Sequence, residues 1–365
     1  MTRRGWCPSV FAPMESGDGL LVRIKPPHCR LSPDQARTVA MAALRDGNGA
    51  IEIGSRASVQ VRGLTDATVP RFARSMIAAG LVCADPGWER RRTVAVAPLA
   101  GEAVSRVGKV LSVYLADEAL TALPLKFGFA VGLPGMTADV HLARTQAGWL
   151  VWPDGAGHGA ASDDPATDAV RLAAAFLAVA PGARRMREAG AAEVFAAAGL
   201  RAEAPLPAND PPELIGPLPG GFGVGLPFGA TDAATLAVLA DVGALWVTPW
   251  RAVVVEQATA ESLAELDLIL DPADPRRAVS ACPGRPACSA GWAETRTVAM
   301  HLAHRFPGLA LHVSGCAKGC AHPAAAPVTL VAAQDGYALV RDGRAGDAPA
   351  ATGLTLEGAA AMIAA

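Results

Sequence analysis

Two short segments near the carboxyl end of the chain carry paired cysteines. ACPGRPACSAG contains Cys282 and Cys288 with five residues between them, and SGCAKGC contains Cys316 and Cys320 with three. Thiolate is a soft ligand, and four thiolates suit either a zinc ion or an iron–sulfur cluster. Because structural zinc sites usually use tighter knuckles, the wider first loop favours a cubane. The spacing therefore predicts a [4Fe–4S] cluster, with zinc as the alternative.

The setting of these cysteines differs from that of the others. Gly315 and Gly319 let the backbone approach closely and leave amide N–H groups free to point at cluster sulfides. Cys7, Cys29 and Cys83 stand alone in the sequence and are predicted to be ordinary. Four of the seven cysteines therefore form the candidate metal centre.

Composition limits the class of protein. A chain of 365 residues is long for one domain, and with 51% hydrophobic and 18% charged residues it can bury large cores. A formal charge of −2 gives no general attraction to nucleic acid. No secretion signal and no apolar run of roughly 20 residues is found. We expect a cytoplasmic protein without membrane or nucleic-acid partners, in which paired thiols stay reduced and bind metal.

The elements before the middle of the chain form a strand–helix–strand unit. GLLVRIKPP (19–27) predicts a strand. A helix follows, with Ser32 as N-cap, Pro33 at its first position and Gly47 as its stop. AIEIGSRASVQVRGL (50–64) alternates apolar and polar residues and predicts a second strand.

The same order returns after the proline-rich stretch 203–221. GFGVGLPFG (221–229) predicts a strand, TDAATLAVLADVG a helix, and ALWVTPWRAVVVEQ (244–257) a strand. Placing Arg56 over Arg251 brings SRASV onto WRAVV. The pattern indicates an internal duplication, although alanine- and valine-rich α+β sequences also resemble one another by accident.

Later segments repeat as well. DVHLARTQAGWLVWPDG and APVTLVAAQDGYALVRDG both predict hairpins, with turns at Gly148 and Gly336. Where the second copy has ACPGRPAC, the first has APLAG, so the cysteine pairs occur in one copy only. The duplication therefore predicts one half that holds an inorganic centre and one that shapes the site.

These segments together resemble the nitrite/sulfite reductase family. Cys-x5-Cys followed by GC-x-x-GC is similar to the family's cluster loops, IEIGSRASVQVRG to the strand whose arginine faces a tetrapyrrole, APLAG to the loop opening the first large half, and LPLKFGFAVG to the lysine segment of the anion site. The resemblance covers nearly the whole chain. It implies an α+β, internally duplicated fold, with two ferredoxin-like half-domains and two larger α/β domains about a pseudo-two-fold axis.

The expected boundaries follow from this resemblance and from the composition of the chain. We predict a ferredoxin-like half-domain, a larger α/β domain, a linker, a second half-domain and a second α/β domain that carries the cluster, at residues 1–85, 86–202, 203–221, 222–270 and 271–365.

Two departures point to one branch of the family. Lys126 is kept, but Gly128 stands where reductases carry a second lysine, and Ala317–Lys318–Gly319 replaces a Pro–Asn sequence. Losing a cation weakens the case for oxyanion reduction. CPSVFAPMESGDGLLVRIKP and HVSGCAKGCAHP resemble a cobalamin-pathway branch of monooxygenases, which hydroxylate a precorrin macrocycle and close a lactone on it. A sirohaem-dependent sulfite or nitrite reductase is the alternative, and a non-catalytic electron-transfer or zinc-stabilised binding protein is a further one.

The candidate substrate site is a set of basic and polar side chains on two strands. Arg56, Gln60 and Arg62 are expected to share one face of their strand. Arg23 and Lys25 of the preceding strand are expected to join them and to pair with substrate carboxylates. The alternative is that these cations are solvated charges at the edge of a sheet.

The resemblance also implies further ligands, cofactors and partners. Lys126 and Lys318 are expected to contact anions, and a mononuclear non-haem iron is implied beside the cluster. The implied partners are dioxygen, the precorrin tetrapyrrole and a reductase that delivers NAD(P)H-derived electrons. An external reductase is implied because GGFGVG (220–225) is followed by no helix, so this chain has no dinucleotide site of its own. The spacing of the residues identifies neither a set of three iron ligands nor a catalytic residue. The histidines considered as iron ligands are His28, His141, His301, His304, His312 and His322.

Overall fold

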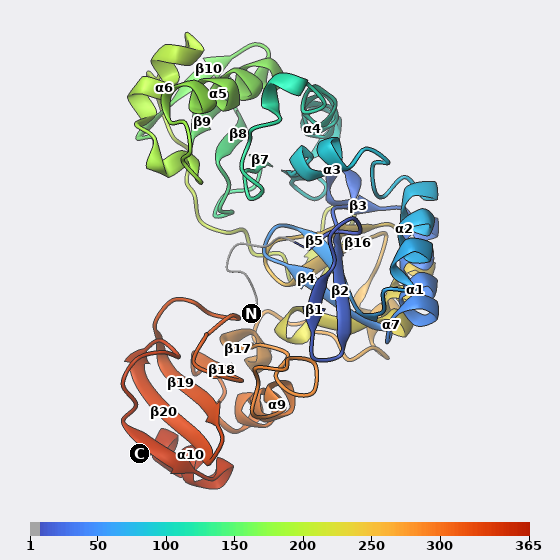
Figure 1. The fold of residues 1–365 in the computed structure, drawn as a ribbon, viewed down its shortest axis with the longest axis vertical. Helices are drawn as coiled ribbons and strands as arrows, with labels where there is room; N and C mark the ends of the chain where they lie inside the picture. Colours follow the sequence, from blue (N-terminus) through green and yellow to red (C-terminus); the bar gives the residue numbers. More distant parts are fainter. Residues whose placement is uncertain (1–7) are drawn as a thin grey trace.

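The computed structural model describes residues 8–365, and Cys7 lies outside the described residues. In Figure 1 a central body lies between the region that follows residue 86, at the top, and the C-terminal region, at the bottom. Both outer regions project to the same side of the central body. In the described range, no helix combines the length and the hydropathy needed to cross a membrane.

The central body consists of two copies of one unit. Each copy has the element order that the duplication predicts, with a short two- or three-residue strand added before the helix. The first copy contains β1 (Met14–Ser16), β2 (Gly19–Ile24), β3 (Arg30–Leu31), α1 (Pro33–Asp46), β4 (Ala50–Gly54), β5 (Ser58–Leu64) and α2 (Val69–Ala78). The second contains β12 (Gly216–Leu218), β13 (Gly221–Gly225), β14 (Ala230–Asp232), α7 (Ala233–Val242), β15 (Leu245–Val247), β16 (Ala252–Glu256) and α8 (Ala260–Leu263).

The two copies exchange strands. Strand β3 pairs with β15 of the second copy, and β14 pairs with β4 of the first, so each five-stranded sheet is completed by its counterpart. Helices α1 and α7 pack against each other, and a single hydrophobic core contains Leu31, Ile51, Leu245 and Val253 from both copies. Because each sheet needs a strand of the other copy, neither half can bury its core alone.

The structure confirms the predicted α1 and corrects the strands that follow it. Ser32 caps α1 together with Gln35 in a capping box, and Gly47 ends the helix. The segments 50–64 and 244–257, predicted as single strands, are hairpins instead. In the first hairpin, Ala57 adopts a left-handed conformation with φ 50°. Apolar alternation does not report such a reversal, because it continues on the returning strand.

The two outer regions repeat one another too. Each contains a sheet of three parallel strands continued by antiparallel ones, three in the first region and two in the second. The hairpins predicted at Gly148 and Gly336 are confirmed. The first comprises α3 (Pro86–Arg91), β6 (Val94–Val96), α4 (Gly101–Tyr114), β7 (Phe129–Val131), β8 (Val140–Thr145), β9 (Gly148–Pro153), β10 (His158–Ser162), α5 (Pro165–Val179), α6 (Ala191–Ala198) and the edge strand β11 (Ala204–Pro205). The second comprises β17 (Val279–Ala281), α9 (Thr295–Arg305), β18 (Leu311–Ser314), β19 (Ala326–Ala333), β20 (Gly336–Gly343), β21 (Ala351–Leu354) and α10 (Leu356–Ala364).

Corresponding 3₁₀ turns connect the central body to the outer regions. His28 in the turn Pro27–Cys29 and Phe228 in the turn Pro227–Gly229 adopt the same left-handed conformation, with φ 57° and 56°. Phe228 packs into the core of the C-terminal region. Burial, and then the charges of Lys109 and Arg92, lower the pKa of His28 to about 4. One copy therefore carries a titratable group where the other is apolar.

We predict that His28→Phe reduces the acid sensitivity of the fold. The unfolded chain binds a proton at His28 below its ordinary pKa of about 6.5, whereas the folded chain does so only near the lowered value, so stability falls as the pH falls between them. Between about pH 7 and pH 5 the variant should lose about 1 kcal/mol less unfolding free energy than the parent chain, as measured by urea unfolding. The exposed His158 provides the matched control, His158→Phe. An unchanged pH dependence in His28→Phe would contradict the assignment.

Candidate active site

The cysteine loops lie side by side at one edge of the C-terminal sheet. The first loop follows β17 and the second follows β18, and these two strands are parallel neighbours. The Gly315 amide donates a hydrogen bond of 3.2 Å to Cys282 Sγ. The Thr295 hydroxyl donates to the Cys282 carbonyl oxygen. Parallel pairing therefore brings together two cysteine pairs that are far apart in the sequence.

The four thiols lie within electrostatic range of one another. Partial burial of its sulfur and the neighbouring Cys316, Cys282 and Cys288 raise the pKa of Cys320, although that residue as a whole is exposed. A Cβ atom at Gly315 would lie 3.4 Å from Cys282 Sγ, so the two loops are closely packed. Within residues 8–365, no three His, Cys, Asp or Glu side chains are arranged to hold a single metal ion. Four thiols on two adjoining loops are soft donors of the kind that an iron–sulfur cluster uses.

The first cysteine loop docks on the N-terminal half-domain. The Ala287 carbonyl oxygen accepts hydrogen bonds from the Gly17 amide, at 3.1 Å, and from Ser16 Oγ, at 2.7 Å. A third, of 2.5 Å, comes from Arg62 Nη2. The candidate metal centre is therefore held against β1, the turn after it and β5.

A basic cavity of about 260 Å³ lies between the first half-domain and the start of the next region. Three of the predicted cations, Arg23, Lys25 and Arg56, line it together with Arg90 and the apolar Phe11. The Lys25 ammonium donates to the Glu89 carbonyl oxygen at 2.6 Å and to Thr93 Oγ1 at 3.1 Å. The remaining lining residues are Pro8, Ser9, Ala12, Ser58, Pro86, Glu89, Thr93 and Leu125.

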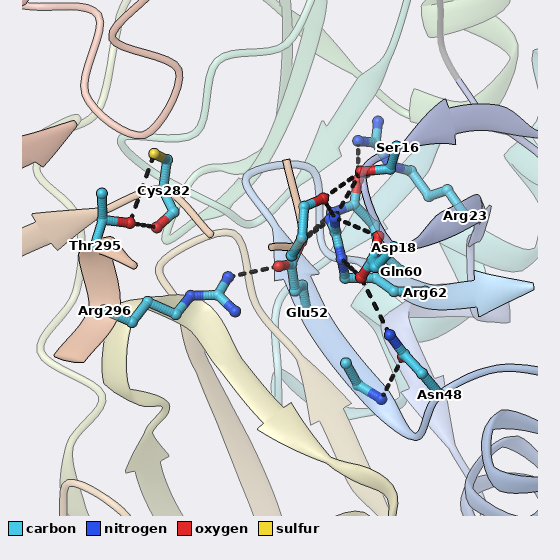
Figure 2. Close-up of polar contacts among 12 residues, drawn as sticks. Ser16, Asp18, Arg23, Asn48, Glu52, Gln60, Arg62, Cys282, Thr295 and Arg296 are labelled. Atoms are coloured by element: carbon cyan, nitrogen blue, oxygen red, sulfur yellow. Dashed lines mark hydrogen bonds and ion pairs between the residues drawn. The ribbon is translucent and has the colours of Figure 1, made fainter. Parts of the chain in front are cut away.

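The predicted row of Arg56, Gln60 and Arg62 on one strand face is wrong. Arg56 lies in the hairpin turn before β5, and only Gln60 and Arg62 belong to that strand. Arg23 donates a hydrogen bond to Gln60 Oε1. Gln60 Nε2 in turn donates to the Glu52 carboxylate at 3.0 Å. Arg62 is 3% exposed and does not line the cavity. Arg56 thus lies at the cavity, whereas Arg62 contacts the first cysteine loop. Figure 2 shows Arg62 among Ser16, Asp18 and Glu52.

The predicted anion-binding lysines lie at two different places. Lys126 lines a second cavity of about 360 Å³ with Arg184 and Arg185, and Leu125 borders both this cavity and the first. Lys318 is exposed beside Cys320, and its charge opposes the rise in the pKa of that thiol. The basic lining thus continues from the first cavity past Leu125, while Lys318 belongs to the cysteine loops.

Asp139 fixes the segment that carries Lys126 and was missed in the sequence. Its fully buried carboxylate accepts hydrogen bonds from the amides of Gly128, at 3.0 Å, and Met186, at 2.9 Å. Arg185 donates two more, at 2.9 and 3.1 Å. A single acidic residue before a strand gives no sequence signal of this kind, because its partners come from two segments that are distant in the sequence.

Gly128 is also held by close packing. A Cβ atom at this position would lie 3.1 Å from Thr93 Cγ2, which is closer than most real contacts of this kind. A side chain at position 128 would therefore require a small shift of Thr93, which lines the basic cavity.

The histidines considered as iron ligands are scattered. His141 stacks on Trp152 with ring centroids 5.4 Å apart, His301 and His304 lie on α9, and His28 lies in its 3₁₀ turn. Only His312 and His322 lie together, with ring centroids 5.7 Å apart. Both ring nitrogens of His312 are buried without a hydrogen-bond partner within the described part of the chain. Burial, and then His322 and Arg251, lower the pKa of His312 to about 4.

Comparisons with known proteins agree with this architecture. A family model of the nitrite/sulfite reductase ferredoxin-like half domain matches residues 12–79. The structure of the Mycobacterium tuberculosis NirA protein is similar with a TM-score of 0.65 at 20% identity, over 86% of this chain and 70% of that one. The chain thus has the nitrite/sulfite reductase-like fold, and the predicted fold class is confirmed.

A second comparison is closer in sequence. The precorrin-3B synthase of Sinorhizobium sp. is 34% identical over an alignment 397 positions long, which covers 96% of this chain and 85% of that protein. The chain therefore belongs to the precorrin-3B synthase family, a family of enzymes. The predicted branch of the reductase-like fold is confirmed by this relationship.

We predict that Asp139→Asn destabilises the region that carries Lys126. The amide keeps the shape of the carboxylate but removes its charge, so Arg185 loses its ion pair and the unfolding free energy should fall by about 3 kcal/mol. Asp34→Asn is the control, since the Asp34 side chain is 95% exposed in its pair with Arg37. The unfolding free energy of this variant should fall by less than about 0.5 kcal/mol. Urea unfolding followed by tryptophan fluorescence measures both. Equal losses in the two variants would refute the role of Asp139.

Proposed function

We propose that this chain is an oxygen-dependent monooxygenase that converts precorrin-3A to precorrin-3B, by hydroxylation and lactone formation before ring contraction in aerobic cobalamin biosynthesis. The observation that carries the proposal is the basic cavity, in a member of this family, on the same half-domain that docks the first cysteine loop. A cytoplasmic location is part of the proposal.

The cavity would bind carboxylates of the macrocycle. Arg23, Lys25 and Arg56 supply the positive charge, and arginine can pair with a carboxylate bidentately. Phe11 and Leu125 add apolar surface for the ring. At about 260 Å³ the cavity is smaller than a site that buries a drug-sized ligand, roughly 300–1,000 Å³, so it would take one edge of the macrocycle. Lys126, in the cavity beyond Leu125, would contact a further carboxylate.

The cysteine loops would hold a [4Fe–4S] cluster through Cys282, Cys288, Cys316 and Cys320. When bound, such a cluster supplies single electrons, here drawn from NAD(P)H through a partner reductase. The protein's own part is to orient the macrocycle edge and to exclude water from it. Lys318 would add positive charge beside the cluster.

A mononuclear non-haem iron remains a prediction. The described residues offer no group of three side chains suited to one ion, so we derive no step through such a centre. The alternative function, a sirohaem-dependent sulfite or nitrite reductase, is disfavoured because Gly128 replaces a cation and Thr93 fills the space beside it.

We predict about four irons and four sulfides per chain, with a broad brown absorption and no haem bands, in anaerobically purified protein. Cys282→Ser should remove most of the iron and sulfide, because it deletes one ligand. Cys83→Ser, at an isolated half-buried cysteine, is the control and should leave both unchanged. Iron, sulfide and zinc assays with a visible spectrum on one sample decide the matter. One zinc without sulfide would refute the cluster, and extracted sirohaem would support the alternative reductase.

We further predict that Arg56→Gln weakens binding of a polycarboxylated tetrapyrrole. Uroporphyrin is a stable probe, and its affinity is measured by quenching of its fluorescence. Loss of one charge-assisted hydrogen bond, worth about 1.5–3 kcal/mol, should weaken binding about ten- to a hundredfold. Arg74→Gln, at an exposed arginine of α2 outside the cavity lining, should bind as the parent chain does. Equal affinities in both variants would exclude the cavity as the binding site.

A further inference from the structure

Arg62 is a buried cation with a complete set of partners. Its side chain is 4% exposed and pairs with Asp18 at 2.9 Å and with Glu52 at 3.5 Å. Its Nη2 also donates to Asp18 Oδ1 at 3.0 Å and to Ser16 Oγ at 2.7 Å. Burial opposes the charge, but Glu52 and Asp18 outweigh it, and the pKa of Arg62 is raised above its ordinary value. The guanidinium is therefore a fixed charge in a fixed place.

The same guanidinium reaches the cysteine loop. Its hydrogen bond to the Ala287 carbonyl oxygen acts on the peptide unit that leads into Cys288. Ser16 and Gly17 donate to the same oxygen. A carbonyl with three donors, one of them charged, holds its peptide plane more firmly than a single neutral hydrogen bond would.

Glu52 connects the other end of the loop to the same network. Arg296 at the start of α9 donates to Glu52, and the adjacent Thr295 hydroxyl donates to the Cys282 carbonyl oxygen. Figure 2 shows Glu52 between Arg296 and Arg62. The half-domain therefore contacts the Cys288 side of the first loop directly, and it contacts α9 beside the residue that holds Cys282.

The second loop is held differently. Ser314 Oγ donates to the Cys316 carbonyl oxygen at 2.7 Å, and Arg251 donates to the Ala321 carbonyl oxygen at 2.9 Å. Arg251 belongs to the second copy, where the matching registers of the two hairpins place it at the position of Ala57, so the predicted overlay of Arg251 on Arg56 is wrong by one residue. The two cysteine pairs thus depend on separate anchors, which an experiment can tell apart.

We propose that Arg62, held by Asp18 and Glu52, is a positioning residue that fixes Cys288 through the Ala287 carbonyl, so that the first cysteine pair is set in place by the N-terminal half-domain. The role of Cys288 as a cluster ligand rests on the proposed function. The docking of its loop does not, because it is a property of the chain itself. The Arg23–Gln60–Glu52 contacts extend the same network to the basic cavity.

The test measures alkylation of each cysteine by N-ethylmaleimide in the full-length protein with chelator present, by mass spectrometry. Arg62→Lys keeps the charge but lacks the planar fork that reaches Asp18, Glu52 and Ala287 together. In this variant Cys288 should be alkylated at least about tenfold faster than in the parent chain, which corresponds to about 1.4 kcal/mol of docking free energy lost. The alkylation rates of Cys316 and Cys320 should change by less than about twofold. Arg37→Lys, in an exposed pair with Asp34, is the control.

Gly17→Ala tests the same contact without changing a charge. A Cβ atom there would lie 2.4 Å from the Pro286 carbonyl oxygen and 2.7 Å from the Ser289 amide nitrogen, so the loop must move away. The same selective rise in the alkylation rate of Cys288 is expected. Gly157→Ala is the control, because no atom lies within 4 Å of a Cβ atom at that position. If Arg62→Lys fails to fold, Gly17→Ala decides.

Two results would overturn the proposal. One is an unchanged Cys288 rate in either folded variant. The other is an equal rise at Cys288, Cys316 and Cys320, which would show general loosening of the fold. Iron and sulfide assays on the same samples test the cluster separately, so a protein without iron would refute the proposed function and leave the alkylation result standing.

Discussion

The exchange of β3 and β14 between the two copies is the constraint on which the rest of the structure depends. Backbone groups at a sheet edge need partners, and here each edge is completed by the other copy. The 3₁₀ turns adjoining the exchanged strands carry His28 and Phe228, which contact the two outer regions. The exchange therefore fixes the position of both outer regions relative to the shared core, and with it the positions of the cavity and the cysteine loops.

Within this symmetric frame the copies have diverged chemically. The loops after β17 and β18 carry the thiols, whereas the corresponding loops after β6 and β7 border a largely apolar cavity of about 300 Å³ with Ala100, Gly132 and Leu133. Arg251 takes the place of Ala57 in the second hairpin and donates to Ser280 and Ala321, whereas Arg56 of the first hairpin lines the basic cavity. Duplication supplied two sets of positions, and each function occupies only one of them.

Helix ends and the two glycine hairpin turns were predicted correctly from the sequence, because caps and glycine turns are local signals, while the role of the cysteines as cluster ligands stays a prediction. The capping box at Ser32 and the hairpin turn at Gly148 are examples. The hairpin turn at Ala57 was missed, since a non-glycine residue in a left-handed conformation leaves no compositional mark. Strand exchange and the partners of Arg62 and Asp139 were also beyond reach, because both depend on contacts between distant segments.

The close contact between Gly128 and Thr93 has an evolutionary consequence. Thr93 Oγ1 accepts a hydrogen bond of 3.1 Å from Lys25, so the threonine that crowds position 128 also orders a cation of the basic cavity. The space for a side chain at position 128 and the hydrogen bond of Lys25 therefore depend on the same residue. Substitutions at positions 93 and 128 are expected to be coupled in evolution.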